Sequence, residues 1–170
     1  TVSDWNARFI TEEVMPIALE GLSITSSPRG HSAVGLSSGG IAGFNIAWYR
    51  NDIFGNAILG SPSFGNIRGG NIWPSVIRTT DEKKDLRTCF CVGKYDADII
   101  FGDWILANRD IASALNYRNY DFRLIIDDMG HSMHFLKRMI PEALEWIYHG
   151  KEIEESDCEV VRPYELKMTP

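Results

Sequence analysis

The stretch that decides the fold is His31-Ser-Ala-Val-Gly-Leu-Ser-Ser-Gly-Gly-Ile41. Its first part, residues 31–36, is short, apolar and bounded by a turn, which is typical of a buried strand. From Ser38 to Arg50 the apolar side chains instead predict a helix. Between strand and helix lies the pattern Gly-x-Ser-x-Gly, centred on Ser37. In a strand–turn–helix setting, this pattern presents the serine hydroxyl as a nucleophile at the carboxyl end of the strand.

The chemistry of a nucleophilic serine explains the spacing. A tight turn from strand to helix strains the backbone and projects the hydroxyl into a cleft. Glycines at 35 and 39 are expected to let the strand and the helix approach without Cβ clashes. The N–H of Ser38 then faces the cleft at the helix N-terminus, where it is predicted to stabilise an oxyanion. The alternative interpretation is a glycine- and serine-rich turn that binds phosphate or has no ligand.

Strands and helices alternate along the rest of the chain. The apolar residues predict helices at 4–20, 104–117 and 135–148, the first of them loosened by Pro16. They also predict strands at 56–60 and 122–126, and a third strand that ends with residues 89–93. Such alternation indicates right-handed βαβ units and a parallel sheet. We therefore expect one α/β domain over residues 1–150. Residues 151–170 are charged and predict a surface tail whose only apolar contacts come from Val160 and Val161.

Candidate partners for the serine follow two later strands. In parallel sheets, sites form at the carboxyl ends of strands. Asp96 and Asp98 follow the strand that ends near Gly93, and His131 follows the strand at 122–126. The chain order serine, acid, histidine is that of a nucleophilic triad. We predict that His131 accepts the proton of Ser37 and that Asp96 orients the imidazole, with Asp98 as the alternative acid.

A second histidine lies close to His131 in sequence. His134 is three residues further on and could line the same cleft. A histidine pair at this spacing also occurs in zinc sites, but no third ligand is evident nearby, so we predict no metal.

Five further residues are candidates for substrate binding. Three of them lie on the glycine-rich loop after the second strand, namely Ser63, Asn66 and Arg68. The planar guanidinium of Arg68 suits an anionic substrate group, and the alternative is an ordinary surface arginine. Trp104 and Asn108 share one helix face at i and i+4, so we expect one of them to contact substrate while the other packs.

Composition excludes several classes of protein. The 170 residues are 44% hydrophobic and 24% charged, which suits one globular domain. The formal charge of −6 argues against nucleic-acid binding, and no apolar stretch approaches the ~20 residues of a membrane span. Three cysteines make a poor disulfide framework and mildly favour a reducing compartment such as the cytoplasm. Cys89 and Cys91 are predicted to be small buried residues rather than metal ligands.

Taken together, these segments resemble the esterase D and enterochelin-esterase-like branch of the α/β-hydrolase superfamily. The resemblance runs from about residue 4 to residue 146 and is strongest in Val34–Ile41, Ser61–Gly70, Gly93–Asp96 with Gly102–Asn108, and Asp128–His131. It implies a three-layer αβα fold around a parallel sheet. It also implies a serine hydrolase of carboxylic esters that uses no cofactor.

The resemblance assigns roles to individual residues. Ser37 is implied as nucleophile, His131 as base, and Asp96 as triad acid because it occupies the family's G-x-x-D position. The histidine loop departs from the family, since it reads Gly-His-Ser-Met-His where close relatives have a glycine-rich form.

The chain also departs from the family before the nucleophile strand. Family members carry a further half-domain before the nucleophile strand, including the loop that donates a second oxyanion N–H. Residues 1–30 precede that strand here, so the resemblance implies a catalytic C-terminal portion that lacks the N-terminal strands. We expect the open sheet edge to be covered by a second copy of the chain or by an N-terminal segment.

The leading hypothesis from the sequence is a serine carboxylesterase that acts on a small-molecule ester through an acyl-enzyme. Two alternatives remain open at this point. One is a non-catalytic binding module with the same fold, since fold does not determine function. The other is an acyltransferase that uses the same three residues.

Overall fold

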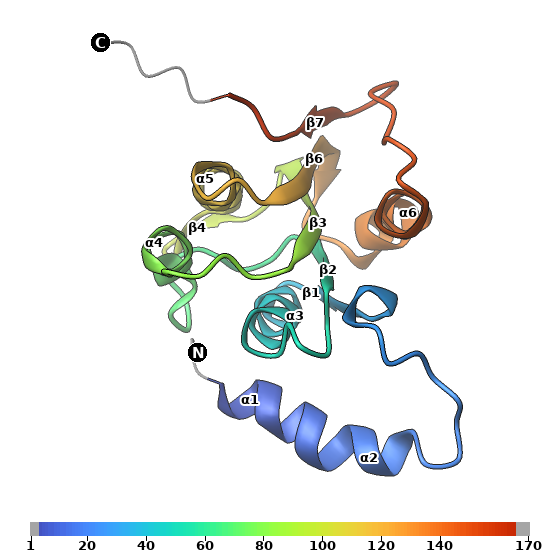
Figure 1. The fold of residues 1–170 in the computed structure, drawn as a ribbon. Coiled ribbons are helices and arrows are strands. Elements are labelled where there is room, and N and C mark those ends of the chain that lie inside the picture. The colour runs from blue at the N-terminus through green and yellow to red at the C-terminus, as the bar shows by residue number, and fades with distance from the viewer. Residues whose placement is uncertain (1–3, 166–170) are drawn as a thin grey trace.

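A five-stranded sheet forms the centre of the molecule (Figure 1). The computed structural model describes residues 4–165. The strand order is β1-β2-β3-β6-β7, in which the first four strands are parallel and β7 runs antiparallel to β6. These strands are β1 (Ser32–Leu36), β2 (Asn56–Gly60), β3 (Arg87–Tyr95), β6 (Asp121–Gly130) and β7 (Glu159–Val161). The predicted parallel sheet is therefore confirmed.

Helices cover both faces of the sheet, which gives the predicted three-layer αβα arrangement. On one face lie α3 (Ser38–Tyr49), α4 (Trp73–Thr79) and α5 (Trp104–Tyr117), and on the other lies α6 (Met133–Leu144) (Figure 1). The smaller elements are α1 (Trp5–Arg8), a π-helical turn (Phe9–Val14), α2 (Met15–Ala18), 3-10 turns (Pro28–Gly30 and Gly70–Ile72), the hairpin β4 (Asp98–Ile99) with β5 (Gly102–Asp103), and a π-helical turn (Glu145–His149). In the described part of the chain, no helix is both long and apolar enough to cross a membrane.

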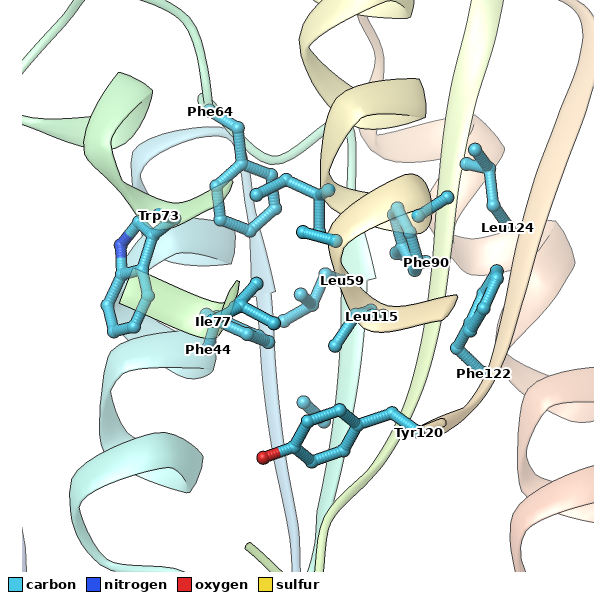
Figure 2. Close-up of a cluster of buried hydrophobic side chains, with 14 of the residues drawn as sticks. Phe44, Leu59, Phe64, Trp73, Ile77, Phe90, Leu115, Tyr120, Phe122 and Leu124 are labelled. Atoms are coloured by element: carbon cyan, nitrogen blue, oxygen red, sulfur yellow. The ribbon is translucent and has the colours of Figure 1, made fainter. Parts of the chain in front are cut away.

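Because both faces are covered, the central strands are apolar almost throughout and side chains alternate between two cores. Large aromatic and aliphatic side chains fill the core under α3, α4 and α5, including Phe44, Trp73 and Phe122 (Figure 2). The core under α6 contains Cys89 and Cys91, each 2% exposed, as predicted. Burial raises the pKa of both thiols, that of Cys91 to about 12.

Helix α4 was not predicted, although the sequence carries two signals for it. Pro74 stands in its first turn, where the missing N–H costs nothing, and Trp73 and Ile77 are spaced four residues apart. Both side chains are fully buried against the core. The segment is short and follows a glycine-rich loop, so its periodic pattern does not stand out.

The N-terminal helical region differs from an ordinary amphipathic helix. Small residues make its buried contacts, Ala7 and Thr11, whereas Trp5 and Ile17 are 70% and 77% exposed. The neighbouring strand β1 is an edge strand within residues 4–165, and its Val34 is 51% exposed. Coverage of this edge by a second copy or by an N-terminal segment stays a prediction.

Residues 154–157 are exposed, as expected of a surface tail, but the burial of Ile153 and the strand β7 were not predicted. Ile153 and Val160 are 3% and 7% exposed, and β7 extends the sheet by pairing with β6. The physical reason is that the free edge of β6 offers unpaired backbone groups and an apolar surface. Glu152 adds a charged contact, because it accepts two hydrogen bonds from Arg123. Residues 166–170 lie outside the described part.

Replacing Val160 with Asp is expected to destabilise the fold by about 2–4 kcal/mol, because the change puts a carboxylate among apolar side chains. Ser156→Asp is the matched control, since it adds the same charge at an exposed position of the same segment. Urea unfolding monitored by tryptophan fluorescence measures both. Equal stabilities of the two variants would show that β7 contributes nothing to the folded core.

Candidate active site

Ser37 occupies the turn between β1 and α3 in a backbone conformation that non-glycine residues rarely adopt, with φ 55° and ψ −120°. Such a conformation costs energy and persists only where the surrounding structure enforces it. Its N–H donates to the carbonyl of Gly60 at 2.8 Å, and its carbonyl accepts from Gly40 and Ile41 in α3. The predicted strand, turn and helix are thus confirmed, and the turn is held at both ends.

The glycines around Ser37 are not equivalent. A Cβ on Gly35 would lie under 3.0 Å from backbone atoms of Gly39 and Gly40, so strand and helix touch at this point. A Cβ on Gly39 would have no neighbour within 4 Å. The close approach on the helix side falls instead at Gly40, whose Cβ would meet Pro62 at 2.8 Å. The prediction of tight packing is confirmed for Gly35 and wrong for Gly39.

Asp96 and His131 come together at the carboxyl ends of β3 and β6. The Nδ1 atom of His131 lies 2.7 Å from a carboxylate oxygen of Asp96. Because an ionised carboxylate only accepts, Nδ1 is the donor in this contact, and in the neutral ring Nε2 is then the acceptor. The carboxylate also accepts from the N–H groups of Ala97 (2.7 Å) and Gly93 (3.3 Å). Its orientation is therefore fixed from three directions.

The surroundings of this pair explain why Asp96 rather than Asp98 meets the imidazole. The Asp96 side chain is 0% exposed, while that of His131 is 34% exposed and accessible from solvent. Asp98 is exposed and belongs to the β4–β5 hairpin. The Trp104 ring packs edge-to-face beneath the imidazole, with ring centroids 6.1 Å apart, and is itself only 3% exposed. Trp104 thus packs against the histidine ring and helps to hold it in place.

A close main-chain approach and one ion pair hold the two loops side by side. A Cβ on Gly93 would collide with the carbonyl of Met129, so β3 and β6 approach closely just before Asp96 and His131. Lys94 forms an ion pair with Asp128 at 2.8 Å across the two strand ends. These contacts were not predicted, because they depend on which strands become neighbours.

The Ser37 hydroxyl has a partner of its own. Its Oγ lies 3.2 Å from the Oγ of Ser63, which is 2% exposed. Within residues 4–165, no hydrogen bond joins Ser37 to His131. The structure thus brings Ser37 together with Ser63, and Asp96 together with His131, as two pairs at neighbouring strand ends. In unliganded enzymes, catalytic hydrogen bonds are often long and tighten only when substrate binds.

A cavity of about 240 Å³ lies beside the Ser37 turn. It is lined by Trp5, Asn6, Ser38, Ile41, Ala42, Asn45, Ser63, Ile67 and Arg68. Three residues predicted from the sequence are therefore placed around one space, namely Ser38, Ser63 and Arg68. The contribution of Trp5 and Asn6 was missed, since nothing in the local pattern connects the N-terminal helix to this loop.

Two other predicted residues lie elsewhere. Asn108 is fully buried, and its amide donates to the carbonyls of Pro62 (3.1 Å) and Trp104 (2.8 Å). It therefore positions the loop from beneath and offers no surface to a substrate. Asn66 is exposed outside the cavity, and its N–H donates to the carbonyl of Phe101.

Within residues 4–165, no cluster of histidine, cysteine and acidic side chains has the arrangement of a metal site.

Most of the chain matches known proteins. The family model Esterase matches residues 2–156. The chain belongs to this esterase family. No curated protein matches the sequence at a significant level.

Solved structures share the fold at low sequence identity. A ferulic acid esterase superposes with a TM-score of 0.70 at 14% identity, over 84% of this chain and 60% of that one. The enterochelin esterase of Shigella flexneri gives 0.69 at 15%, over 83% and 36%. An S-formylglutathione hydrolase from Agrobacterium tumefaciens gives 0.63 at 18%, over 82% and 55%. These neighbours establish the α/β-hydrolase fold, and this chain spans less than two thirds of each of them.

The difference in packing between Gly35 and Gly39 gives a test of the turn. Gly35→Ala is expected to lower the free energy of unfolding by about 1–3 kcal/mol, because strand and helix must separate. Gly39→Ala is expected to leave it unchanged or raise it by up to about 1 kcal/mol, since alanine favours the helix. Urea titration of both variants measures the difference. A Gly39 variant as unstable as the Gly35 variant would contradict the structure of the turn.

Proposed function

We propose that this protein is a serine hydrolase of carboxylic esters in which Ser37 is the nucleophile, His131 the base and Asp96 the orienting acid. The observation that carries the proposal is the Asp96–His131 pair at the ends of β3 and β6, in the same sheet whose strand β1 ends at the strained turn of Ser37. Family membership supports ester chemistry. The buried carboxylate and the accessible ring match what a base and its orienting group require.

The proposed reaction begins when substrate enters beside Ser37. The hydroxyl leaves its contact with Ser63 and gives its proton to Nε2 of His131 as Oγ bonds to the ester carbonyl carbon. Ser38 is the first residue of α3, so its N–H has no partner within the helix and can donate to the oxyanion. His131 then protonates the departing alcohol.

The second half of the reaction uses water. His131 takes a proton from a water molecule, whose oxygen attacks the acyl carbon of the Ser37 ester. Collapse of this second tetrahedral intermediate releases the acid and restores the serine. Asp96 keeps the imidazole in the required tautomer and stabilises its charged form in both halves.

Substitutions at the three residues test the proposal against p-nitrophenyl butyrate. Ser37→Ala, His131→Gln and Asp96→Asn are each expected to lower kcat about 10³-fold or more, because the three groups act as a unit. The matched controls are His134→Gln and Asp98→Asn, which remove the same groups two or three positions away. A fluorophosphonate should add one mass adduct to the wild type, located on Ser37.

Three results would separate the alternatives. Equal hydrolysis by wild type and Ser37→Ala would overturn the nucleophile. Ligand binding without turnover or adduct would indicate a non-catalytic module. Product ratios shifted towards new esters by an added alcohol, at the expense of free acid, would indicate acyl transfer by the same residues.

A further inference from the structure

Arg68 differs from every other arginine of the chain. The other ten each donate a hydrogen bond or form an ion pair, namely Arg8, Arg29, Arg50, Arg78, Arg87, Arg109, Arg118, Arg123, Arg138 and Arg162. Arg68 has no such partner among residues 4–165. A guanidinium that the fold leaves unpaired remains available to a ligand.

The position of Arg68 is imposed by the loop. Its backbone lies in the left-handed region at φ 51°, and Gly69 follows in the same region at φ 78°. Unfavourable conformations of this kind persist where the surrounding contacts enforce them, and they gather at ligand-binding sites. The result is a charged side chain at the wall of the cavity next to Ser38 and Ser63.

One charged side chain, that of Arg68, lines this cavity. Of its nine residues, Arg68 alone is ionised, and the rest are apolar or neutral. No acidic side chain among them offsets the guanidinium, although the chain as a whole carries a charge of −6. An anionic group inside the cavity would therefore meet a single cation with two parallel donors, a geometry that matches a carboxylate.

Geometry also indicates which half of an ester enters. The departing alcohol must receive its proton from His131, so it lies on the side of the histidine loop. No residue of that loop lines the cavity, which is bounded by α1, α3 and the loop after β2. The acyl chain is the half that remains on Ser37, and it is the half that this cavity can receive.

The volume of the cavity limits the length of the acyl group that it can hold. Pockets for drug-sized ligands typically occupy about 300–1,000 Å³, and this cavity measures about 240 Å³. We propose that it is an acyl site that selects short acyl chains ending in a carboxylate, with Arg68 as the specificity-determining residue. The substrate class is thus the half-esters of small dicarboxylic acids. This inference rests on the hydrolysis proposed above.

The chemistry of such a substrate balances with water alone. Ser37 Oγ bonds to the ester carbonyl carbon, the alcohol leaves with a proton from His131, and water releases the dicarboxylic acid. The terminal carboxylate forms and breaks no bond. It stays paired with Arg68 in every step and keeps the acyl chain in place.

The test compares two ethyl esters of equal shape. Monoethyl succinate carries the carboxylate, and ethyl 4-methylpentanoate has an isopropyl group in its place. The ratio of their kcat/KM values, measured by ethanol release, should favour the succinate in the wild type. Arg68→Gln should reduce this ratio about tenfold or more, and Arg68→Lys should retain part of it. Arg109→Gln, which removes the same charge from α5, should leave the ratio as it is.

A binding measurement separates this inference from the proposed hydrolysis. In Ser37→Ala, calorimetry should detect monoethyl succinate, and Ser37→Ala/Arg68→Gln should bind it about tenfold more weakly or worse. Turnover of both esters with a ratio insensitive to Arg68→Gln would overturn the acyl site and leave the hydrolase intact. Arg68-dependent binding without turnover or Ser37 labelling would support the site and overturn the hydrolysis.

Discussion

The close approach of main chains at the carboxyl ends of the parallel strands is the constraint on which the site depends. Gly35 touches the first turn of α3, and Gly93 touches the carbonyl of Met129 in β6. Both contacts leave no room for a Cβ. The first contact sets the turn between β1 and α3 that carries Ser37, and the second sets the approach of the two strand ends that carry Asp96 and His131. The shared sheet, in which β2 lies between β1 and β3, relates the two parts to each other.

Two features of the proposed site differ in character. At the ends of β3 and β6, the imidazole of His131 packs edge-to-face against the buried Trp104 and is oriented by a carboxylate that accepts three hydrogen bonds. Beside the Ser37 turn lies a small cavity lined by Arg68, whose guanidinium has no hydrogen bond or ion pair among residues 4–165. The proposed reaction uses both features, since His131 protonates the departing alcohol and the cavity receives the acyl group.

The sequence pattern predicted the elements near this site well. The helix at 104–117 and the strand at 56–60 have the predicted bounds, because their apolar periods are uninterrupted. Prediction failed where contacts between distant segments decide the outcome. Helix α4 is too short to stand out beside its glycine-rich neighbour, and β7 forms only because β6 offers a free edge.

The sequence by itself determined the strand–turn–helix around Ser37 and the order of the three candidate residues, because local periodicity and glycine spacing act over a few positions. It also led to the esterase family. Only the tertiary structure decided between Asp96 and Asp98, showed that Gly39 has no close packing neighbour, and brought Trp5 and Arg68 to the same cavity. Those outcomes depend on which side chains meet after folding, and packing between segments far apart in the chain sets such meetings.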